Sequence, residues 1–541
     1  MPHPLLVAIQ SFRDDRNFWR VLNQRLEALG CDPVRLLSVG TQEDRFGEGY
    51  STGDFDQSVS VLLNSDADRQ RRVLEAWTGD VIALVDQTLM ERLPPKPCTV
   101  QPTRLFLCGW ADKRPDAAQI RLFEAYFGCP VEGVVDENLC LTLRAGGSAD
   151  PAMLLSLLPS CSKASSVQPD VPADKDRRSI LFVTSNGVGL GHLTRCLAIA
   201  KRMDPARFDI SFASMSRAVP KVEEFGFDYA YVPGPDKTQG NAPDWDAQLE
   251  VDLAHHINRT RADTLIFDGN YPYPGLRAVL DARLCTTSIW IRRAMWRRSH
   301  RHPLPELEKA FSLVVEPGDV AEAFDVGITT QRRDHVAKIG PVTLLDTSEI
   351  LDRTAARAAL GAGEQDLVGV LQIGALSNNT NGDMAKAMIT ALQRQMSDGL
   401  KLIWIANPIA DPVHAEQAAA LGLDIQSHFP LQQYARGIDF SIVGGGYNSV
   451  HEAIQARIPC VYIPNEGGMM DAQLTRAQWV ETCGGGLVVR AHEFWKVDQA
   501  MARVLSSEDR SSMADVLDRM AFENGASDGA KLIQNLILNA G

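Results

Sequence analysis

Long apolar runs are missing from this 541-residue sequence, and so are paired cysteines. No segment approaches the roughly 18 to 20 uninterrupted apolar residues that a membrane-spanning helix requires. The opening residues, MPHPLLVAIQSFRDD, have neither a basic leader nor a long apolar core. Ten cysteines are scattered from Cys31 to Cys483 without a CxxC pair, which disfavours a zinc site or a disulfide framework. We therefore expect a cytoplasmic protein.

Positive charge is also in deficit. Lysine and arginine number 54 against 68 aspartates and glutamates, which gives a formal net charge of −14 at pH 7. Binding to nucleic acid needs a broad basic surface that neutralises phosphates, so we expect no nucleic-acid partner. The length exceeds what one hydrophobic core usually supports and predicts about three to four domains.

A polar, proline-containing stretch, CSKASSVQPDVPADKDRRS, interrupts the apolar periodicity and predicts a linker over residues 163–179. Before it, PLLVAIQSF, DVIALVDQTL and TRLFLCGWA are typical of strands, with helices expected over NFWRVLNQRLEALG and AAQIRLFEAYFG. Residues 1–162 are thus expected to form an amino-terminal α/β domain of unknown role.

Strand and helix patterns alternate regularly after the linker, which predicts βαβ units and parallel sheets. The first series contains strands at 179–185, 208–214, 228–233, 263–269 and 286–292, and helices at 192–203 and 218–226. The second contains strands at 367–374, 401–407, 440–446, 460–464 and 486–490. We predict an α/β fold of two Rossmann-like doubly wound halves, 180–345 and 346–541, facing a crevice.

The first series opens on the turn TSNGVGLGHLTR at residues 184–195. A helix is expected to begin near Gly191, which leaves Gly187 and Gly189 in a turn where a ligand or the facing half can approach closely. The spacing is GxGxG and not the GxGxxG of dinucleotide-binding proteins. His192 has two interpretations: a reactive group, or a helix-start histidine that bonds only to the backbone.

The second half contains the denser motif, GGGYNSVHEAI, between a strand and a helix. Asn448 and Ser449 are expected to cap this helix, and Glu452 lies about one turn into it. A carboxylate there can accept hydrogen bonds from both hydroxyls of a ribose. The alternatives are that Gly445 and Gly446 serve only packing and that Glu452 merely complements the helix dipole.

GGGYNSVHEAI, IPCVYIPN and MMDAQLTRA, together with GVGLGH, resemble nucleotide-sugar glycosyltransferases of the GT-B fold. The similarity is to the superfamily of the bacterial peptidoglycan N-acetylglucosaminyl transferase, and it covers about residues 179–541. It implies a nucleotide-sugar donor, UDP-linked, that is a substrate and not a cofactor.

The resemblance also implies donor-binding residues. Glu452 matches the residue that binds the ribose, and Asn448, Ser449, Gly445 and Gly446 match the diphosphate-binding helix start. Asp471 and Gln473 match a motif that contacts sugar hydroxyls, although Ala472 stands where a second acid is often found. Gly374, in the turn QIGALSNNT, matches a phosphate neighbour.

No pair of acids resembling DxD ends a strand, so we expect metal-independent transfer in which helix amino termini stabilise the leaving diphosphate. The acceptor hydroxyl needs a base, and His192 and Asp268 are the candidates. A paired Asp268 would support the imidazolium that forms on His192. Asp268 could instead cap a loop at the end of its strand.

Basic residues gather in SIWIRRAMWRRSHRH, at 288–302. Arg292 and Arg293 could hold an acceptor phosphate, and arginine with tryptophan suits an anionic membrane surface. We place them with Gly189 and Gly191 on the acceptor side. The alternative is a solvated face with salt bridges to neighbouring acids.

Taken together, these patterns predict a glycosyltransferase that moves a sugar to a hydroxyl of a glycan or a lipid-linked acceptor, with inversion. Peripheral contact with the inner face of a membrane is expected. There are two alternatives. One is a nucleotide-sugar hydrolase or epimerase of the same fold, since GLGHLTR also resembles a hydrolase family. The other is a non-catalytic binding module.

Overall fold

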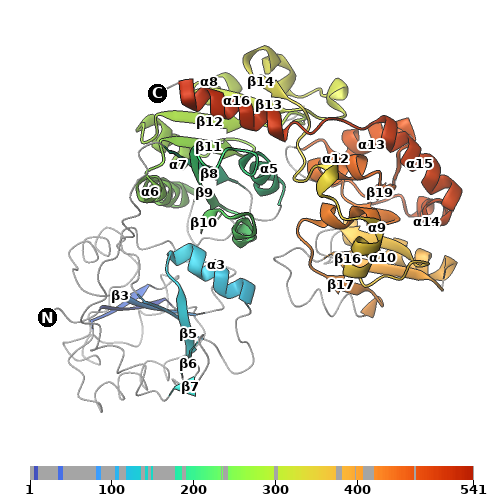
Figure 1. The fold of residues 1–541 in the computed structure, drawn as a ribbon, viewed down its shortest axis with the longest axis horizontal. Helices are drawn as coiled ribbons and strands as arrows, with labels where there is room; N and C mark the ends of the chain where they lie inside the picture. The colour runs from blue at the N-terminus through green and yellow to red at the C-terminus, as the bar shows by residue number, and fades with distance from the viewer. Residues whose placement is uncertain are drawn as a thin grey trace.

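A computed structural model of the chain contains three sheets, each built mainly from parallel strands (Figure 1). It describes residues 5–9, 35–39, 81–86, 104–108, 117–135, 141–143, 148–149, 177–185, 190–232, 234, 242–297, 303–372, 380–396, 398–405, 420–467 and 471–539.

The amino-terminal sheet has the strand order β2-β1-β3-β4-β5-β6-β7. Its strands are β1 (Leu5–Ile9), β2 (Arg35–Val39), β3 (Val81–Asp86), β4 (Arg104–Cys108), β5 (Val131–Val135), β6 (Leu141–Leu143) and β7 (Ser148–Ala149). They pair in parallel up to β5, and β6 and β7 are antiparallel. The three predicted strands are confirmed, as is the predicted helix α3 (Ala117–Phe127), whereas the helix predicted over residues 17–30 lies outside the described residues.

Helix α3 connects this domain to the next sheet. Leu122 and Tyr126 on α3 are buried in the same hydrophobic core as Tyr231, which ends strand β10 (Asp228–Tyr231). The rings of Tyr126 and Tyr231 pack edge to face with centroids 6.2 Å apart. The amino-terminal domain therefore shares a core with the domain that follows it.

The second sheet is fully parallel in the order β10-β9-β8-β11-β12-β13-β14. Its other strands are β8 (Arg178–Thr184), β9 (Phe208–Ser214), β11 (Thr264–Asp268), β12 (Thr287–Ile291), β13 (Leu313–Pro317) and β14 (Ala337–Ile339). Helices α5 (Gly191–Ala200), α6 (Ala242–Thr260), α7 (Pro274–Asp281) and α8 (Leu304–Glu308) connect them. The strand order reverses direction at β8 and β11, which is where a doubly wound sheet opens its crevice.

One predicted helix of this half has a different geometry. Residues 218–226 form a 3₁₀ helix, η2 (Val219–Phe225), in place of an α-helix. Pro220 occupies its first turn, and Gly226 stops it with a φ of 80°. The left-handed Gly226 ends this segment after seven residues, as glycine commonly ends helices.

The third sheet is parallel in the order β17-β16-β15-β18-β19-β20, with its reversal at β15 and β18. Its strands are β15 (Leu367–Gln372), β16 (Leu400–Ile405), β17 (Asp424–Gln426), β18 (Phe440–Val443), β19 (Cys460–Tyr462) and β20 (Gly486–Val488). The helices include α10 (Thr380–Gln395), α12 (Tyr447–Ala456), α13 (Gln473–Cys483), α14 (Val497–Leu505) and α15 (Ser507–Arg519). Two Rossmann-like halves are thus confirmed.

The last helix, α16 (Ala526–Asn539), corrects the expected boundary of the second half at 346–541. Its residues Ala530 and Ile533 are buried in the core of the first half together with Ile199 of α5. Figure 1 shows α16 lying over the second sheet and not over the third. Just before α16 the chain passes close to Gly340, which lies between the two halves. A Cβ on Gly525 would lie 2.2 Å from the carbonyl oxygen of Gly340. Alternating patterns along the sequence cannot reveal such a return.

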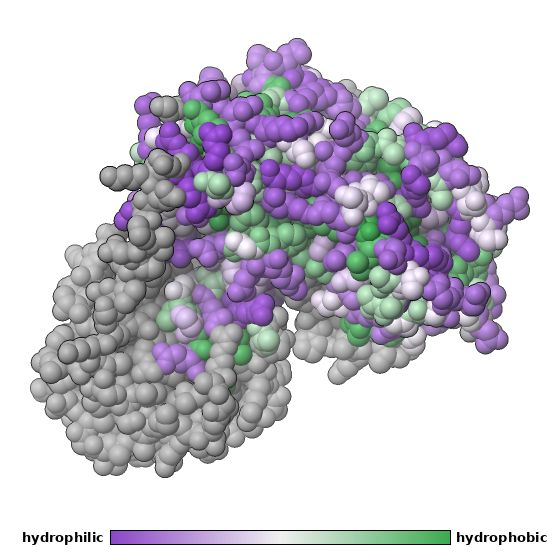
Figure 2. Space-filling model, in the orientation of Figure 1, coloured by the Kyte–Doolittle hydropathy of each residue, from purple (hydrophilic) through white to green (hydrophobic). Residues whose placement is uncertain are grey.

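The surface in Figure 2 carries hydrophilic residues over much of its coloured part, with hydrophobic residues in small groups between them. None of the helices in the described part of the chain is long and apolar enough to cross a membrane. The expected cytoplasmic location stays a prediction.

Truncating Ile533 tests whether α16 belongs to the first half. We expect Ile533→Ala to lower the free energy of unfolding by about 2–5 kcal/mol, because it opens a cavity in a core where this side chain is fully buried. Amide hydrogen exchange should then accelerate in β8 and β9 and not in β15 and β16. Asn535→Ala on the exposed face of the same helix is the control; equal acceleration in both sheets would contradict the assignment.

Candidate active site

His192 and Asp268 form a hydrogen-bonded pair at the carboxyl edge of the second sheet. Asp268 ends β11 beside Thr184, which ends β8, and His192 lies in the first turn of α5 directly after β8. His192 Nδ1 lies 2.6 Å from Asp268 Oδ1. The expected proximity of these two residues is confirmed, and Asp268 is a partner of His192 and not only a loop cap.

The tautomer of His192 follows from its neighbours. Nδ1 lies 2.6 Å from a carboxylate oxygen, which can only accept a hydrogen bond, and 3.1 Å from Nη2 of Arg195, which can only donate one. The shorter contact requires a proton on Nδ1, so Nη2 merely packs against it and Nε2 holds the free electron pair.

Burial decides the charge of the pair. His192 is 7% exposed and Asp268 is fully buried. Burial lowers the pKa of His192; the hydrogen bond and charge of Asp268 only partly offset this, and Arg195 and Arg293 lower that pKa further. For Asp268, burial raises the pKa, but the charge of Arg195 and the hydrogen bond from His192 more than offset it, so the pKa lies below its ordinary value. The pair at neutral pH is a neutral imidazole on a carboxylate, which is the ground state of a general base.

Arg195 is a site residue to which the sequence analysis assigned no role. Its Nε donates to Asp268 Oδ2 at 2.8 Å and its Nη2 to Oδ1 at 2.5 Å. Arg195 and His192 are three residues apart on α5, and this spacing places both side chains on one face of the helix. The available signal was an arginine three residues after the histidine of GLGHLTR, which a helix places on the same face.

The start of α12 differs from the expectation. Gly446 is the N-cap in an extended conformation, Tyr447 is the first helical residue, and no side chain caps the helix. Asn448 and Ser449 therefore lie inside the first turn and are not capping residues. Because Gly446 takes the extended N-cap conformation, the helix begins earlier than the capping side chains suggested, and its first N–H groups have no partner within the helix.

The glycines before α12 have different surroundings. A Cβ on Gly445 would lie 2.7 Å from the carbonyl oxygen of Gln473, so the packing of α13 requires glycine there. A Cβ on Gly446 would meet nothing within 4 Å. Packing thus explains Gly445, whereas Gly446 borders open space.

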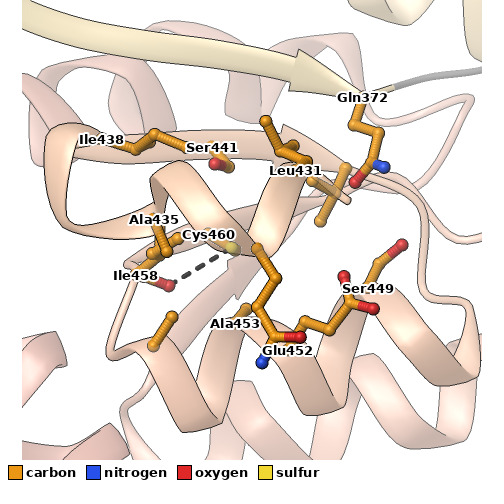
Figure 3. Close-up of a pocket in the computed structure, with 13 residues that line it drawn as sticks. Gln372, Leu431, Ala435, Ile438, Ser441, Ser449, Glu452, Ala453, Ile458 and Cys460 are labelled. Atoms are coloured by element: carbon orange, nitrogen blue, oxygen red, sulfur yellow. Dashed lines mark hydrogen bonds between the residues drawn. The ribbon is translucent and has the colours of Figure 1, made fainter. Parts of the chain in front are cut away.

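Glu452 and Ser449 line a cleft in the second half, together with Gln372 at the end of β15 (Figure 3). The empty space at this cleft measures about 380 Å³, including solvent outside its mouth. Figure 3 shows the carboxylate of Glu452 turned toward Ser449 and Gln372. Burial raises the pKa of Glu452 to about 7, with no basic group offsetting it. The sequence prediction had placed Glu452 and Ser449 at one site, and the structure brings them together.

The two halves meet where their first turns face each other. A Cβ on Gly191, at the start of α5, would lie 4.0 Å from Asn448 Oδ1, in the first turn of α12. This oxygen is buried and has no hydrogen-bond partner among the described residues. The helix that carries His192 is thus in contact with the helix start of the second half.

Tyr447 attaches α12 to the first half. Its hydroxyl donates to the carbonyl oxygen of Gly318 at 2.9 Å and accepts from the N–H of Val342 at 2.9 Å. The guanidinium groups of Arg195 and Arg476 lie 5.3 and 5.8 Å from the centroid of its ring. The sequence analysis treated Tyr447 only as part of the motif, because its role depends on residues more than 100 positions away.

Asp471 is held between two arginines. Its Oδ1 lies 3.0 Å from Nη2 of Arg476, and its Oδ2 lies 3.1 Å from Nη1 of Arg293 in the other half. Arg476 also pairs with Asp319 at 2.7 Å. Although burial raises the pKa of Asp471, the charges of Arg293 and Arg476 bring it well below its ordinary value. Asp471 joins the halves, and its contact with a donor sugar stays a prediction.

Gln473 begins α13 and accepts a hydrogen bond from the N–H of Asn465 at 3.0 Å through Oε1. Its expected contact with sugar hydroxyls also stays a prediction. Gly189 and Gly374 lie outside the described residues, and Gly191 begins α5 as expected.

Arg292 does not face an acceptor. Its side chain is fully buried, with ion pairs to Glu308 and, at 2.7 Å, to Glu316. The alternative of a solvated face with salt bridges is right only in part for Arg292: the salt bridges to neighbouring acids exist, but they are buried and not solvated. Arg293 borders the crevice through its pair with Asp471.

Metal ligands do not cluster in the described part of the chain, where no group of three or more histidine, cysteine, aspartate or glutamate side chains could hold an ion. Metal independence stays a prediction.

From residue 178 onward the chain has the GT-B fold, which consists of two Rossmann-like halves. No protein-family model matches the chain, and no curated protein matches it. Solved structures that it resembles include MurG of Acinetobacter baumannii, with a TM-score of 0.46, 14% identity, and coverage of 66% of this chain and 99% of that chain.

Two further resemblances are of the same kind. The spinosyn rhamnosyltransferase SpnG, complexed with thymidine diphosphate, has a TM-score of 0.43, 14% identity, and coverage of 66% of this chain and 99% of its own. A putative UDP-N-acetylglucosamine 2-epimerase from Listeria monocytogenes has a TM-score of 0.47, 10% identity, and coverage of 65% and 94%. The substrates named here are those of the solved proteins.

His451 offers a test of the interface between the halves. Its Nδ1 donates to the carbonyl oxygen of Tyr447 at 2.7 Å, and its Nε2 accepts from the N–H of Val320 at 3.1 Å. Burial lowers the pKa of His451 to about 4. A proton on Nε2 would displace the hydrogen bond that joins α12 to the first half.

We expect acid to destabilise this interface. Between pH 6.5 and pH 4 the unfolded state binds a proton that the native His451 does not, so stability falls as pH falls, by roughly 3 kcal/mol at pH 4. His451→Gln, whose amide can donate and accept in the same place, should remove this part of the pH dependence. Urea denaturation of both proteins at pH 7, 5 and 4 measures it, and parallel curves would contradict the expectation.

Proposed function

We propose that the chain is a glycosyltransferase that moves a sugar from a nucleotide-diphosphate donor to a hydroxyl acceptor. The observation that carries this proposal is the meeting of α5 and α12. It brings the His192–Asp268 pair of one half to the same crevice as the first turn of α12, from which the Glu452 cleft continues. A base and an anion-binding helix start on opposite sides are what such a transfer requires.

The second half has the groups that a donor needs. The free N–H groups in the first turn of α12 can bind the diphosphate, and Gly446 leaves space for it. Glu452, whose carboxylate has no basic partner among the described residues, can accept hydrogen bonds from both ribose hydroxyls. The buried Asn448 Oδ1 lacks a partner in the described structure and can accept from a sugar hydroxyl.

The transfer step assigns each group a role. The acceptor oxygen forms a bond to the anomeric carbon while its proton passes to Nε2 of His192. The bond from that carbon to the phosphate oxygen breaks, and the nucleoside diphosphate leaves with the electron pair. Asp268 stabilises the imidazolium, and the helix amino termini stabilise the departing charge without a metal. Attack opposite the leaving group inverts the anomeric centre.

The acceptor, a glycan or a lipid-linked molecule, and peripheral contact with an anionic membrane from the cytoplasm belong to the same proposal. A nucleotide-sugar hydrolase is the second candidate, because the same His192–Asp268 pair could take its proton from water.

Glu452 predicts how nucleotide binding depends on pH. From pH 6 to pH 8 a carboxyl with a pKa of about 7 changes from about one tenth to about nine tenths ionised. We expect uridine diphosphate to bind up to about tenfold more tightly at pH 8, because the carboxylate accepts two hydroxyls. Glu452→Gln should bind more weakly, by about tenfold, and lose this pH dependence.

Calorimetric titration with uridine diphosphate at pH 6 and pH 8 measures the affinity of each protein. Glu349→Gln, outside the cleft, is the control and should keep the wild-type pH dependence, whereas any dependence that remains in Glu452→Gln belongs to the phosphate itself. An unchanged affinity in Glu452→Gln would remove Glu452 from the donor site.

Activity on a panel of nucleotide sugars tests the function itself. We expect nucleoside diphosphate release that requires an acceptor, lowered by about 10²–10⁴-fold in His192→Ala and in Asp268→Asn. His335→Ala, at an exposed histidine, should keep full activity. Release at full rate without any acceptor would favour the hydrolase, and full turnover in both site variants would contradict the assigned base.

A further inference from the structure

Arg195 holds the carboxylate on which the orientation of His192 depends. Its two contacts, Nε to Oδ2 at 2.8 Å and Nη2 to Oδ1 at 2.5 Å, engage both oxygens of Asp268. Such a bidentate contact fixes the plane of a carboxylate, whereas a single hydrogen bond leaves it free to rotate. The oxygen that His192 contacts, Oδ1, is therefore held in place from the other side.

The same guanidinium contacts the second half. It lies over the ring of Tyr447, 5.3 Å from the centroid, and Tyr447 is the first residue of α12. The hydroxyl of Tyr447 is itself fixed by Gly318 and Val342. Arg195 thus contacts both the His192–Asp268 pair and helix α12 of the second half.

Burial strengthens the electrostatic interaction between Arg195 and Asp268. Arg195 is 2% exposed and Asp268 is fully buried, so neither charge is screened by solvent. Without Arg195, Asp268 would have His192 as its remaining strong partner, and a carboxylate in that position stabilises the protonated imidazole.

We propose that Arg195 is a positioning residue for the transfer: it fixes Asp268 so that His192 presents Nε2 to the acceptor, and it aligns this base with the donor helix through Tyr447. The inference rests on the proposed function for its meaning in catalysis. Its structural content, the state of the imidazole, can be tested without substrate.

The charged groups that face His192 come from three elements. Arg195 lies on α5, Asp268 ends β11, and Arg293 follows β12. Asp268 raises the pKa of His192, while the two arginines lower it. Removing the charge of Arg195 should therefore raise this pKa, so that His192 becomes protonated closer to neutral pH and ceases to act as a base there.

Nitrogen NMR of the histidine side chains provides the direct test. In the full-length protein, with the His192 signal identified by its loss in His192→Gln, we expect the Nδ1–H tautomer and a neutral ring at pH 7. Arg195→Gln should raise the titration midpoint of His192, and Arg195→Lys, which keeps the charge but not the fork, should restore it toward the wild-type value. Unchanged midpoint and tautomer in Arg195→Gln would overturn the proposal.

A matched control separates this effect from the loss of a buried ion pair in general. Arg357 is equally buried and pairs with Asp439 at 2.7 Å, in the second half and without contact to His192. Arg357→Gln should lower stability and leave the His192 titration unchanged. A similar shift in both variants would mean that general loosening, and not positioning, moves the titration.

The pH dependence of turnover completes the test. We expect Arg195→Gln to move the acid limb of kcat to higher pH and to lower kcat at its optimum by roughly tenfold to 10²-fold, with the KM for the nucleotide sugar little changed. Arg195→Lys should keep the acid limb and lose part of kcat. An NMR shift without any transferase activity would leave the positioning intact and defeat the proposed function, whereas activity with an unmoved acid limb would defeat the positioning.

A double variant that removes both charges serves as a control in case Arg195→Gln folds poorly. Arg195→Gln leaves a buried carboxylate with one partner fewer, which can destabilise the protein. Arg195→Gln combined with Asp268→Asn removes both charges and should fold. In it we expect the His192 titration midpoint to lie below that of Arg195→Gln alone, because the carboxylate that stabilises the imidazolium is gone; a midpoint as high as in the single variant would contradict the coupling.

Discussion

Helix α12 is the element on which the arrangement of the halves depends. One of its faces carries Tyr447 and His451, four residues apart, and both hydrogen bond to backbone groups of the first half. The nearly opposite face carries Ser449 and Glu452, which line the cleft. A helix that serves two purposes at once must be placed accurately, and the packing of Gly445 against Gln473 leaves little freedom for its start. The base of one half therefore keeps a defined distance from the cleft of the other.

Charges at the crevice are of two kinds. Asp268, Asp319 and Asp471 are buried with arginine partners, which keep their pKa values below the ordinary range despite burial. In the part of the chain that the structure describes, Glu452 has no such partner, and burial alone raises its pKa. Paired charges stabilise the structure, since removing one partner leaves the other charge buried without compensation for its lost hydration. An unpaired carboxyl in a cleft stays available to a ligand, which is why Glu452 carries the donor side of the proposal.

The sequence allowed much of the site to be predicted, because simple topological rules govern parallel sheets. Gly191 was expected to begin a helix, and Asp268 to end a strand; strands that neighbour each other at the switch point bring such ends together. The His192–Asp268 pair followed. Asn448 and Ser449 were expected as caps, yet the helix starts one residue before them, since a glycine can take the extended N-cap conformation without any side-chain hydrogen bond. Arg292 was expected at the acceptor side, but its side chain points into the protein and pairs with Glu316.

By itself the sequence determined the α/β class, most strands of both halves and the residue types at the two turns, because these depend on local periodicity and on glycine's lack of a side chain. Strands β13, β14 and β17 were not predicted. Only the tertiary structure decided that Arg195 grips Asp268, that Tyr447 stands between two arginines, that Asp471 bridges the halves, and that α16 returns to the first core. Apart from the contacts of Arg195 with Asp268 and of Tyr447 with Arg476, these join residues that lie more than 100 positions apart. Such contacts depend on how completed domains pack, and no local pattern encodes that.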